Sequence, residues 1–577
     1  MKHLNRNKNR FVEYFLLLLT LFSLIITYII GELYFYTPNG TADYVVYEKY
    51  LSFFQYKSEY SESGQGLIYY YLVSFISYLR NNSVTNLNEV NFINANIHFT
   101  NFLIYSLGLI GFYYLLKRYG FRKTSIYISL AAVNFCMPIF IMRAQLKPEV
   151  IAFGLLPWIL LGLENYFEKP SIKSFLVPLF PMTILLNTKG SITGMVALFL
   201  FLSFFKKLKK NLLKHIISFF ILSFSFLLLF SENRSVNEYS VFEQNNLSRQ
   251  PQYDNSADLD FLTNINKWDF YYFPIFPYHN NSAIGITLLD SYGDYFNVYT
   301  NYDENLFIYE KSDLFLFSFK DTDQFNYGQF LPEYSSILFT LILFFLGFYY
   351  SYKNKNNFTY YLSPLIGIFI LTISAFGFPS NNFDPEVGDT LKTTYYSFLT
   401  GLTFIFIVSS VFKKNNIIKI FFIILLPLIF FVVLGFPKED KSKIDFYLEE
   451  KIELSVFCPL IATATIETDV SDCFNNQKKV CEYNIFSNSA KGILNEELKV
   501  FEIGTENPIL FLDNNSNIYP ITSISECKKQ IKLGKEVYNP LFKILRPLPV
   551  INLLNLIFSL FSILYLIKIN QNKNNFK

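Results

Sequence analysis

The sequence predicts an all-α polytopic membrane protein with about twelve transmembrane helices and large extracytoplasmic loops. Hydrophobic residues make up 51% of the 577 residues and charged residues only 16%, whereas soluble proteins average about 25% charged residues. The apolar residues fall in long runs, and about 20 apolar residues in a helix cross the hydrocarbon core of a bilayer. The connections between these runs alternate between basic and non-basic composition.

The first apolar run, at 11–30, is too long and too uninterrupted for a cleaved signal peptide, and no small-residue cleavage site follows it. We therefore expect a retained helix. In chain order, the predicted spans lie near 11–31, 98–116, 125–141, 150–163, 174–188, 191–205, 215–230, 335–351, 358–377, 394–412, 417–436 and 550–567.

Alternate connections are rich in lysine and arginine: "MKHLNRNKNR", "KRYGFRK", "EKPSIK", "KKLKKNLLK", "YKNKN", "KKNNIIK" and "KINQNKNNFK". The other short connections, "MRAQLKPE", "NTKGS" and "FPSNNFDPEVGDTLK", contain few basic residues. Cytoplasmic loops carry an excess of lysine and arginine. The pattern therefore predicts a multi-pass protein of the cell membrane, as in a bacterial inner membrane, with both termini in the cytoplasm.

The prediction divides the chain into five parts. A membrane core at 1–230 includes a first outer segment at 32–97, and a large outer segment follows at 231–334. Further transmembrane helices occupy 335–436, a third outer segment occupies 437–549, and the last span and a cytoplasmic tail occupy 550–577. The apolar stretch in "GQGLIYYYLVSFISYL", in the first outer segment, is short for a span and suits an interfacial helix.

The cysteines fit this sidedness. Cys136 lies inside a predicted span, and the other four lie in the third outer segment: Cys458, Cys473, Cys481 and Cys527. An even number of cysteines on the oxidising side favours two disulfides in a small α/β subdomain, with three pairings open. The alternative is that these cysteines are free, buried thiols.

Asp43 and Glu48 lie in "PNGTADYVVYEKY", shortly after the first span. A carboxylate just above the bilayer can act as a general base toward an incoming hydroxyl or amine. An aspartate in "NGTAD" is, however, also typical of a solvated turn. The local sequence alone favours the turn.

Two further sites combine charge with the predicted membrane surface. In "MRAQLKPEV", Arg143 and Lys147 would attract an anionic group such as a lipid phosphate, and Glu149 lies beside them. The alternative is that these side chains snorkel to ordinary headgroups. In "LLNTKGSITG", Lys189 interrupts an apolar run where two spans meet, so it needs a partner or an anion.

An acidic loop, "DPEVGD", contains Asp384, Glu386 and Asp389. Three acids at this spacing can bind a divalent cation, although a solvated acidic loop is the plainer interpretation. The sequence contains no GxGxxG, P-loop, HExxH or GxSxG motif. If the protein is an enzyme, an activated substrate would therefore come from the membrane as a lipid.

The order of these features resembles the membrane-embedded GT-C glycosyltransferases, among them the protein O-mannosyltransferases, the aminoarabinose transferases and other bacterial polyprenyl-phosphate-sugar transferases. The resemblance covers residues 10–205 and follows five stretches: "TADYVVY", "GQGLIYYYLVSF", "YYLLKRYG", "MPIFIMRAQLKPEVIAFGLLPW" and "LLNTKGS". It implies inverting transfer of a sugar from a polyprenyl-phosphate donor to a glycan, lipid or protein acceptor at the extracytoplasmic face.

The resemblance also implies residue roles. Asp43 would be the general base, with Glu48 as a second candidate, and Lys189, Arg143 and Lys147 would bind the lipid phosphate. Glu149 would be a second acid. Many family members carry Asp-Glu where this chain has Asp43-Tyr44, and aspartate is commoner at the position of Glu149. No cofactor is required, and the resemblance leaves a divalent cation open.

Three other classes remain as alternatives, and one of them is a non-catalytic membrane scaffold. A surface-polysaccharide polymerase or ligase would also combine many spans with large outer loops, but it usually lacks an early acidic outer loop. A transporter would favour inverted repeats, charged groups at the bilayer midplane and small outer loops. No nucleic-acid partner is indicated.

Overall fold

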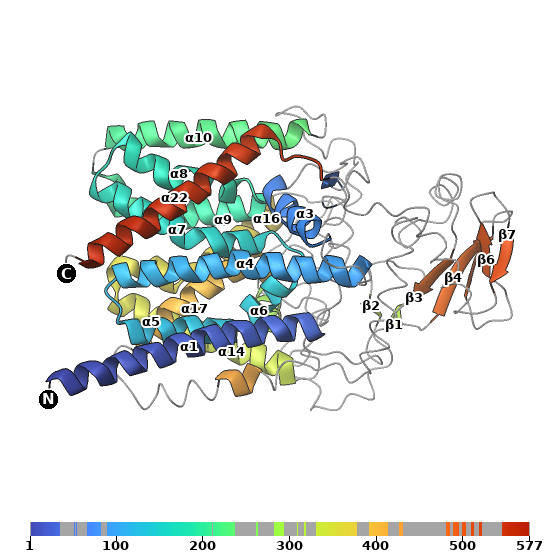
Figure 1. Cartoon of the computed structure of the whole chain (residues 1–577), viewed down its shortest axis with the longest axis horizontal. Coiled ribbons are helices and arrows are strands. Elements are labelled where there is room, and N and C mark those ends of the chain that lie inside the picture. The colour runs from blue at the N-terminus through green and yellow to red at the C-terminus, as the bar shows by residue number, and fades with distance from the viewer. Residues whose placement is uncertain are drawn as a thin grey trace.

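The computed structural model describes most of the helical bundle and a few strands. It covers residues 2–34, 51, 53–54, 66–81, 89–210, 212–236, 261–262, 282–292, 308–309, 317–318, 331–377, 392–412, 426–430, 481–484, 489–494, 499–502, 509–512, 518–521 and 545–575. Figure 1 shows long helices that run side by side, with both chain termini at one end of the bundle. We call this end the termini end and the opposite one the distal end.

The helices follow the chain back and forth between the two ends (Figure 1). Their bounds are α1 Lys2–Tyr34, α3 Leu67–Asn81, α4 Glu89–Arg118, α5 Lys123–Asn134, α6 Met137–Ala144, α7 Glu149–Glu168, α8 Ile172–Leu186, α9 Gly190–Leu208, α10 Leu212–Ser235, α13 Ala283–Leu289, α14 Leu331–Lys353, η5 Lys355–Asn357, α15 Phe358–Tyr361, α16 Ser363–Gly377, η6 Thr393–Tyr396, α17 Ser397–Val411 and α22 Val550–Asn575.

Eight of the described helices are long and apolar enough to cross a membrane, or up to nine if the bent pair α5 and α6 is one span. Two shorter apolar helices, Ile172–Leu186 and Ser363–Ser374, fall where further spans were predicted. The predicted span at 417–436 lies outside the described residues except for 426–430. The chain is thus a largely helical membrane protein, while the total of twelve spans stays a prediction.

The predicted span at 125–141 differs from the structure, because α5 and α6 meet at an angle of 58°. The break lies at Phe135 and Cys136, and Pro138 stands in the first turn of α6. Proline lacks the N–H that a continuing helix needs, but it fits the start of a new helix. The bend carries the last residues of α6, including Arg143, into the interior at the distal end, where all eight α6 residues are buried.

The start of α3 is held against the turn between α8 and α9. The Gly66 N–H donates a hydrogen bond of 3.0 Å to the carbonyl of Thr188. A Cβ atom at position 66 would lie only 2.5 Å from the Asn187 carbonyl oxygen, so only glycine permits this approach. The helix predicted from "GQGLIYYYLVSFISYL" is therefore present, and its first turn lies beside the turn that contains Lys189.

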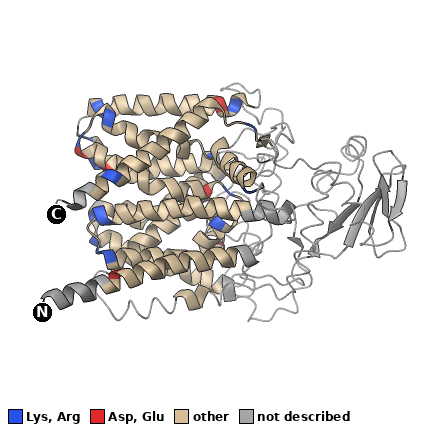
Figure 2. Ribbon diagram, viewed as in Figure 1, with Lys and Arg blue, Asp and Glu red and all other residues tan. Residues whose placement is uncertain are grey.

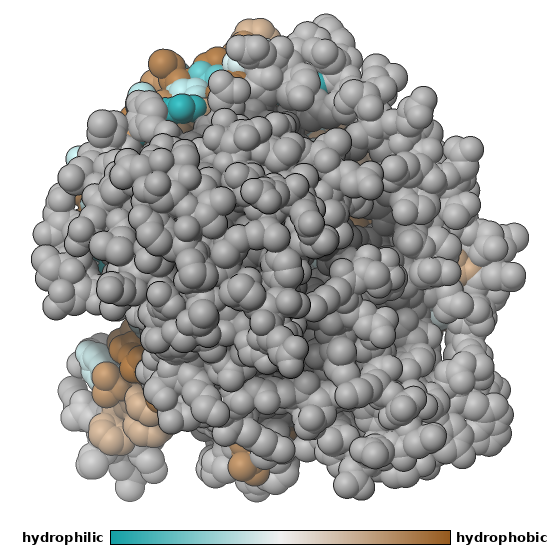
Figure 3. Space-filling view, turned by 90° about the vertical axis from the view of Figure 1, so that its right-hand side faces the viewer, coloured by the Kyte–Doolittle hydropathy of each residue, from teal (hydrophilic) through white to brown (hydrophobic). Residues whose placement is uncertain are grey.

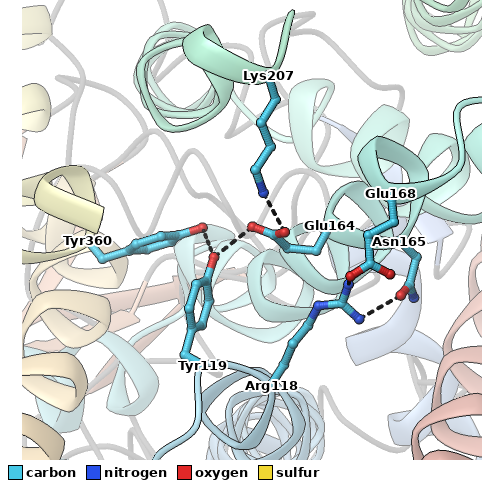
Figure 4. Close-up of polar contacts among 7 residues, drawn as sticks. All are labelled: Arg118, Tyr119, Glu164, Asn165, Glu168, Lys207 and Tyr360. Atoms are coloured by element: carbon cyan, nitrogen blue, oxygen red, sulfur yellow. Dashed lines mark hydrogen bonds and ion pairs between the residues drawn. The ribbon is translucent and has the colours of Figure 1, made fainter. Parts of the chain in front are cut away.

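A network of paired charges joins four helices at the termini end (Figure 4). Glu164 accepts hydrogen bonds from the Tyr119 hydroxyl at 2.8 Å and the Lys207 ammonium at 2.5 Å. Arg118 donates to Asn165 at 2.7 Å and to Glu168 at 2.6 Å. Among the side chains of this network, every charged group has a partner of opposite charge. Figure 2 shows that described lysines and arginines gather at this end.

Short antiparallel strands occur in the second and third predicted outer segments. β1 (Ile308–Tyr309) pairs with β2 (Phe317–Ser318). β3 (Cys481–Asn484), β4 (Ser489–Leu494) and β5 (Lys499–Glu502) form a three-stranded sheet, and β6 (Ile509–Leu512) pairs with β7 (Ile518–Ile521). The third segment thus contains β structure, whereas most of the described residues elsewhere are helical.

The disulfide prediction lies almost wholly outside the described residues. Cys458, Cys473 and Cys527 fall in undescribed stretches, and of Cys481 only the backbone, in β3, is described. Cys136 is a buried free thiol at the start of α6, close to the place that the sequence predicted for it. The two disulfides therefore stay a prediction.

Candidate functional site

The structure brings four of the predicted site residues to the distal end of the bundle. Arg143 lies in the last turn of α6, Lys147 lies in the short connection to α7, Glu149 begins α7, and Lys189 precedes α9. Their burial is unusual for charged residues, since Arg143 is 5% exposed, Lys147 4% and Glu149 0%. We call these four residues the distal charge cluster.

Local sequence explains how two members are held. Pro148 is the N-cap of α7 and ends the connection from α6, so that Glu149 falls in the first turn. A carboxylate is favoured there because the N-terminus of a helix carries partial positive charge. Lys189 is the N-cap of α9 in an extended conformation, directly after the Asn187-Thr188 turn. Both helix starts therefore present their charged side chains at the same end.

Lys189 makes the central contact of the cluster. Its Nζ atom lies 3.0 Å from Oε1 of Glu149, which forms an ion pair between the starts of α7 and α9. The same ammonium lies 3.7 Å from the centre of the Tyr395 ring in η6, and the Lys147 ammonium lies 5.7 Å from that centre. Tyr395 thus provides an aromatic face for both lysines, an arrangement that attracts cations.

The guanidinium group of Arg143 is the least satisfied charge among the described residues of the cluster. Its Cζ atom lies 4.8 Å from the centre of the Tyr105 ring and 5.6 Å from that of Phe140. Both terminal nitrogens are buried, and neither has a hydrogen-bond partner in the described part of the chain. Burying a guanidinium without a hydrogen-bonded anion is costly, so this side chain is suited to receive one.

Two oxygen atoms near Arg143 can also accept further hydrogen bonds. Within the described residues, Oε2 of Glu149 and Oε1 of Gln145 are buried without a hydrogen-bond partner. The site can therefore accept hydrogen bonds from hydroxyl or amine groups as well as donate them to an anion.

A polar scaffold holds the backbone of the cluster. The Nδ2 group of Asn101 in α4 donates to the carbonyls of Arg143 at 2.9 Å and Gln145 at 2.8 Å. The Tyr69 hydroxyl of α3 donates to Oδ1 of Asn101 at 2.9 Å. Burial, and to a smaller extent the nearby Glu149 charge, raise the pKa of Tyr69, so this phenol stays protonated and keeps donating. The scaffold ties α3 and α4 to the connection between α6 and α7.

A small pocket adjoins the cluster between α3, α8, α10 and α22. It is lined by backbone and side-chain atoms of eleven residues: Gly66, Leu67, Ile68, Tyr69, Ile151, Ile184, Asn187, Thr188, Leu229, Asn233 and Asn552. Tyr69 belongs both to the pocket and to the scaffold of the cluster.

Figure 3 views the distal end, and the described residues visible there include apolar patches near the rim, as expected for helices in contact with lipid.

The burial of the distal charge cluster argues against one alternative from the sequence. Snorkelling side chains place their charged ends in water or among headgroups. Arg143 and Lys147 instead lie inside the structure, with less than a tenth of their surface exposed. These basic side chains are therefore part of the interior.

Several predicted residues lie outside the described part of the chain. These are the two acids of the first outer segment and the three of the acidic loop: Asp43, Glu48, Asp384, Glu386 and Asp389. Their roles stay predictions. Within the described residues, no group of three or more His, Cys, Asp and Glu side chains could hold a metal ion.

The sequence missed three residues that shape the site. Tyr395 lies in "KTTYYS", which contains no signal of its own. Asn101 is a single amide in the apolar stretch "FTNFLIY", and a polar residue buried in a span calls for a partner. Gln145 belongs to the quoted motif "MRAQLKPEV" but was not singled out.

No protein-family model, curated protein or solved structure matches this chain. What supports a function is therefore the chemistry of the distal charge cluster, together with the sequence resemblance over residues 10–205.

Proposed function

We propose that the protein is a glycosyltransferase of the GT-C type that moves a sugar from a polyprenyl-phosphate donor to a glycan, lipid or protein acceptor. The observation that supports this most directly is the buried Arg143 guanidinium, whose terminal nitrogens have no hydrogen-bond partner among the described residues. It shares the distal end with two buried or half-buried lysines and one carboxylate. A lipid phosphate supplies the anion that such a group needs.

In the proposed mechanism, the lipid phosphate binds at the distal end, which would face the extracytoplasmic side. Arg143 can bind two phosphate oxygens in a planar fork, whereas Lys189 and Lys147 act as point charges. These cations stabilise the negative charge that grows on the phosphate as its bond to the sugar breaks. Asp43 takes the proton from the acceptor hydroxyl or amine, which attacks the anomeric carbon from the opposite face and inverts it.

The orientation in the membrane is part of the proposal. The described basic residues that gather at the termini end would lie in the cytoplasm. The distal charge cluster would then meet a donor whose sugar is presented on the other side.

The proposal can be tested by binding of farnesyl phosphate to the full-length protein in detergent micelles, with farnesol as the neutral control. We expect the phosphate to bind and the alcohol not to. Arg143→Gln should weaken the phosphate complex by about 10–100-fold, the value of lost charge-assisted hydrogen bonds. Arg118→Gln, a matched change at the termini end, should leave affinity unchanged.

Two outcomes would count against the proposal. Equal binding of farnesyl phosphate and farnesol would show that the cluster does not recognise a phosphate. Markedly tighter binding of farnesyl diphosphate would favour the polymerase or ligase alternative, whose lipid substrates carry a diphosphate.

A further inference from the structure

Asp290 is a buried carboxylate that the proposed mechanism does not use. It follows α13 and is 3% exposed. The neighbouring residues fix it against α14: Ser291 Oγ donates to the Ser336 carbonyl at 2.8 Å, and the Ser336 hydroxyl donates to the Leu289 carbonyl at 2.8 Å. This part of the segment at 231–334 is therefore anchored in the bundle.

The Asp290 carboxylate reaches the start of η6. Its Oδ2 atom accepts a hydrogen bond of 2.9 Å from the Thr393 N–H, across 103 positions of sequence. The first N–H groups of a helix need acceptors, and the N-cap residue Lys392 does not cap η6 with its side chain. Asp290 thus does for η6 what a local cap residue does in most helices.

Two positions after Thr393, Tyr395 provides the aromatic face of the distal charge cluster. The ring of Tyr395 lies under the Lys189 ammonium at 3.7 Å and within 5.7 Å of the Lys147 ammonium. Because η6 is only four residues long, a shift of its start moves the Tyr395 ring. Both ammonium groups lie near that ring, so a shift of the ring changes the surroundings of both.

We infer that Asp290 is a positioning residue that holds Tyr395, and through it Lys189 and Lys147, in the arrangement that receives the phosphate. Asp290 thereby connects the described part of the segment at 231–334 to the site. The part of this inference that concerns phosphate affinity rests on the proposed function. The part that concerns Tyr395 does not.

The experiment places 3-fluorotyrosine at position 395 of the full-length protein and records its fluorine resonance in micelles, together with farnesyl phosphate affinity. Asp290→Ala should shift the resonance and weaken binding by up to about tenfold, the upper limit set by the stability that a lost helix cap removes. Asp290→Asn keeps an oxygen acceptor and should produce a smaller change in both. Lys189→Met should shift the resonance as well, because it removes the cation above the ring.

Glu232→Ala is the matched control. The Glu232 carboxylate also caps a helix at a distance, since its oxygens accept from the N–H groups of Ile551 at 2.8 Å and Asn552 at 2.6 Å at the start of α22. Its loss should lower stability without moving the Tyr395 resonance. An unchanged resonance in Asp290→Ala, or the same shift in Glu232→Ala, overturns the positioning role.

The same measurements distinguish a failure of the proposed function from a failure of the positioning role. If the wild-type protein does not bind farnesyl phosphate but Asp290→Ala still shifts the resonance, the proposed function fails and the positioning role stands. If the phosphate binds and Asp290→Ala shifts the resonance without weakening binding, the link to the site is wrong.

Discussion

The two ends of the helical bundle use the same kinds of residue to different effect. At the termini end, Glu164 is shared by Lys207 and Tyr119, and Arg118 is held by two acceptors (Figure 4). At the distal end, the terminal nitrogens of Arg143 have no hydrogen-bond partner among the described residues. The number of charges is thus a poor guide to a binding site. What distinguishes the distal end is hydrogen-bonding capacity that the described chain leaves unused.

The largest expected effect concerns the side of the membrane on which each end lies. The comparison of the two ends fails if the distal end lies in the cytoplasm. A reporter fused after Phe230 should lie outside the cytoplasm, whereas one fused after Lys210 should lie inside it, because lysine-rich connections stay in the cytoplasm. Phosphatase and fluorescent-protein fusions measure this as an all-or-none difference. The reverse pattern would overturn the proposed orientation and every role given to the distal end.

The second test concerns Asp43, the proposed general base that acts together with the distal charge cluster. Asp43→Asn should lower sugar transfer by about 10²–10⁴-fold, the usual contribution of a general base, while the melting temperature and membrane insertion stay unchanged. Transfer is measured with a labelled polyprenyl-phosphate sugar. Glu48→Gln is the control and should reduce transfer less. Full activity of Asp43→Asn would exclude it as the base.

The third test compares one lysine from each end. Lys189→Met leaves the buried Glu149 charge without its ion-pair partner and should cost about 3–5 kcal/mol of stability. Lys207→Met removes a side chain that is 44% exposed and should cost about 0–1 kcal/mol. Thermal unfolding in detergent measures both.

Stability and binding separate in the double variant Lys189→Met/Glu149→Gln. Because both charges are gone, much of the lost stability should return, whereas farnesyl phosphate affinity should stay at least about tenfold below wild type. Recovery of affinity together with stability would mean that the pair is structural, like its counterpart at the termini end.

The last test removes a single hydroxyl at the termini end. Tyr119→Phe removes the hydroxyl that donates to Glu164 and bonds to Tyr360 at 2.8 Å. Burial raises the pKa of Tyr119, so the lost group is a neutral phenol. We expect a loss of about 1–3 kcal/mol in stability and no change in farnesyl phosphate affinity. A change in affinity would show that the two ends are coupled.

The sequence predicted much of the fold because hydrocarbon thickness sets the length of a span. The eight long helices follow the predicted runs, and the bend at Phe135 was missed because Pro138 also fits within a single apolar pattern. For the site, the charged residues were identified because charge is conspicuous in an apolar sequence. Tyr395 and Asp290 were not, since tyrosines are common in the predicted spans and acidic residues in the outer segments, and the contacts of both residues span more than a hundred positions.

The hydrogen bond between Gly66 and Thr188 has a consequence for biogenesis. A chain is synthesised from its N-terminus, so α3 emerges well before the turn between α8 and α9 exists. The Gly66 N–H therefore lacks the Thr188 carbonyl as an acceptor until several later helices have been inserted. A nascent chain stalled before Thr188 would therefore lack a docked α3, and a substitution at Gly66 would act as a late assembly defect in a protein whose early helices insert normally.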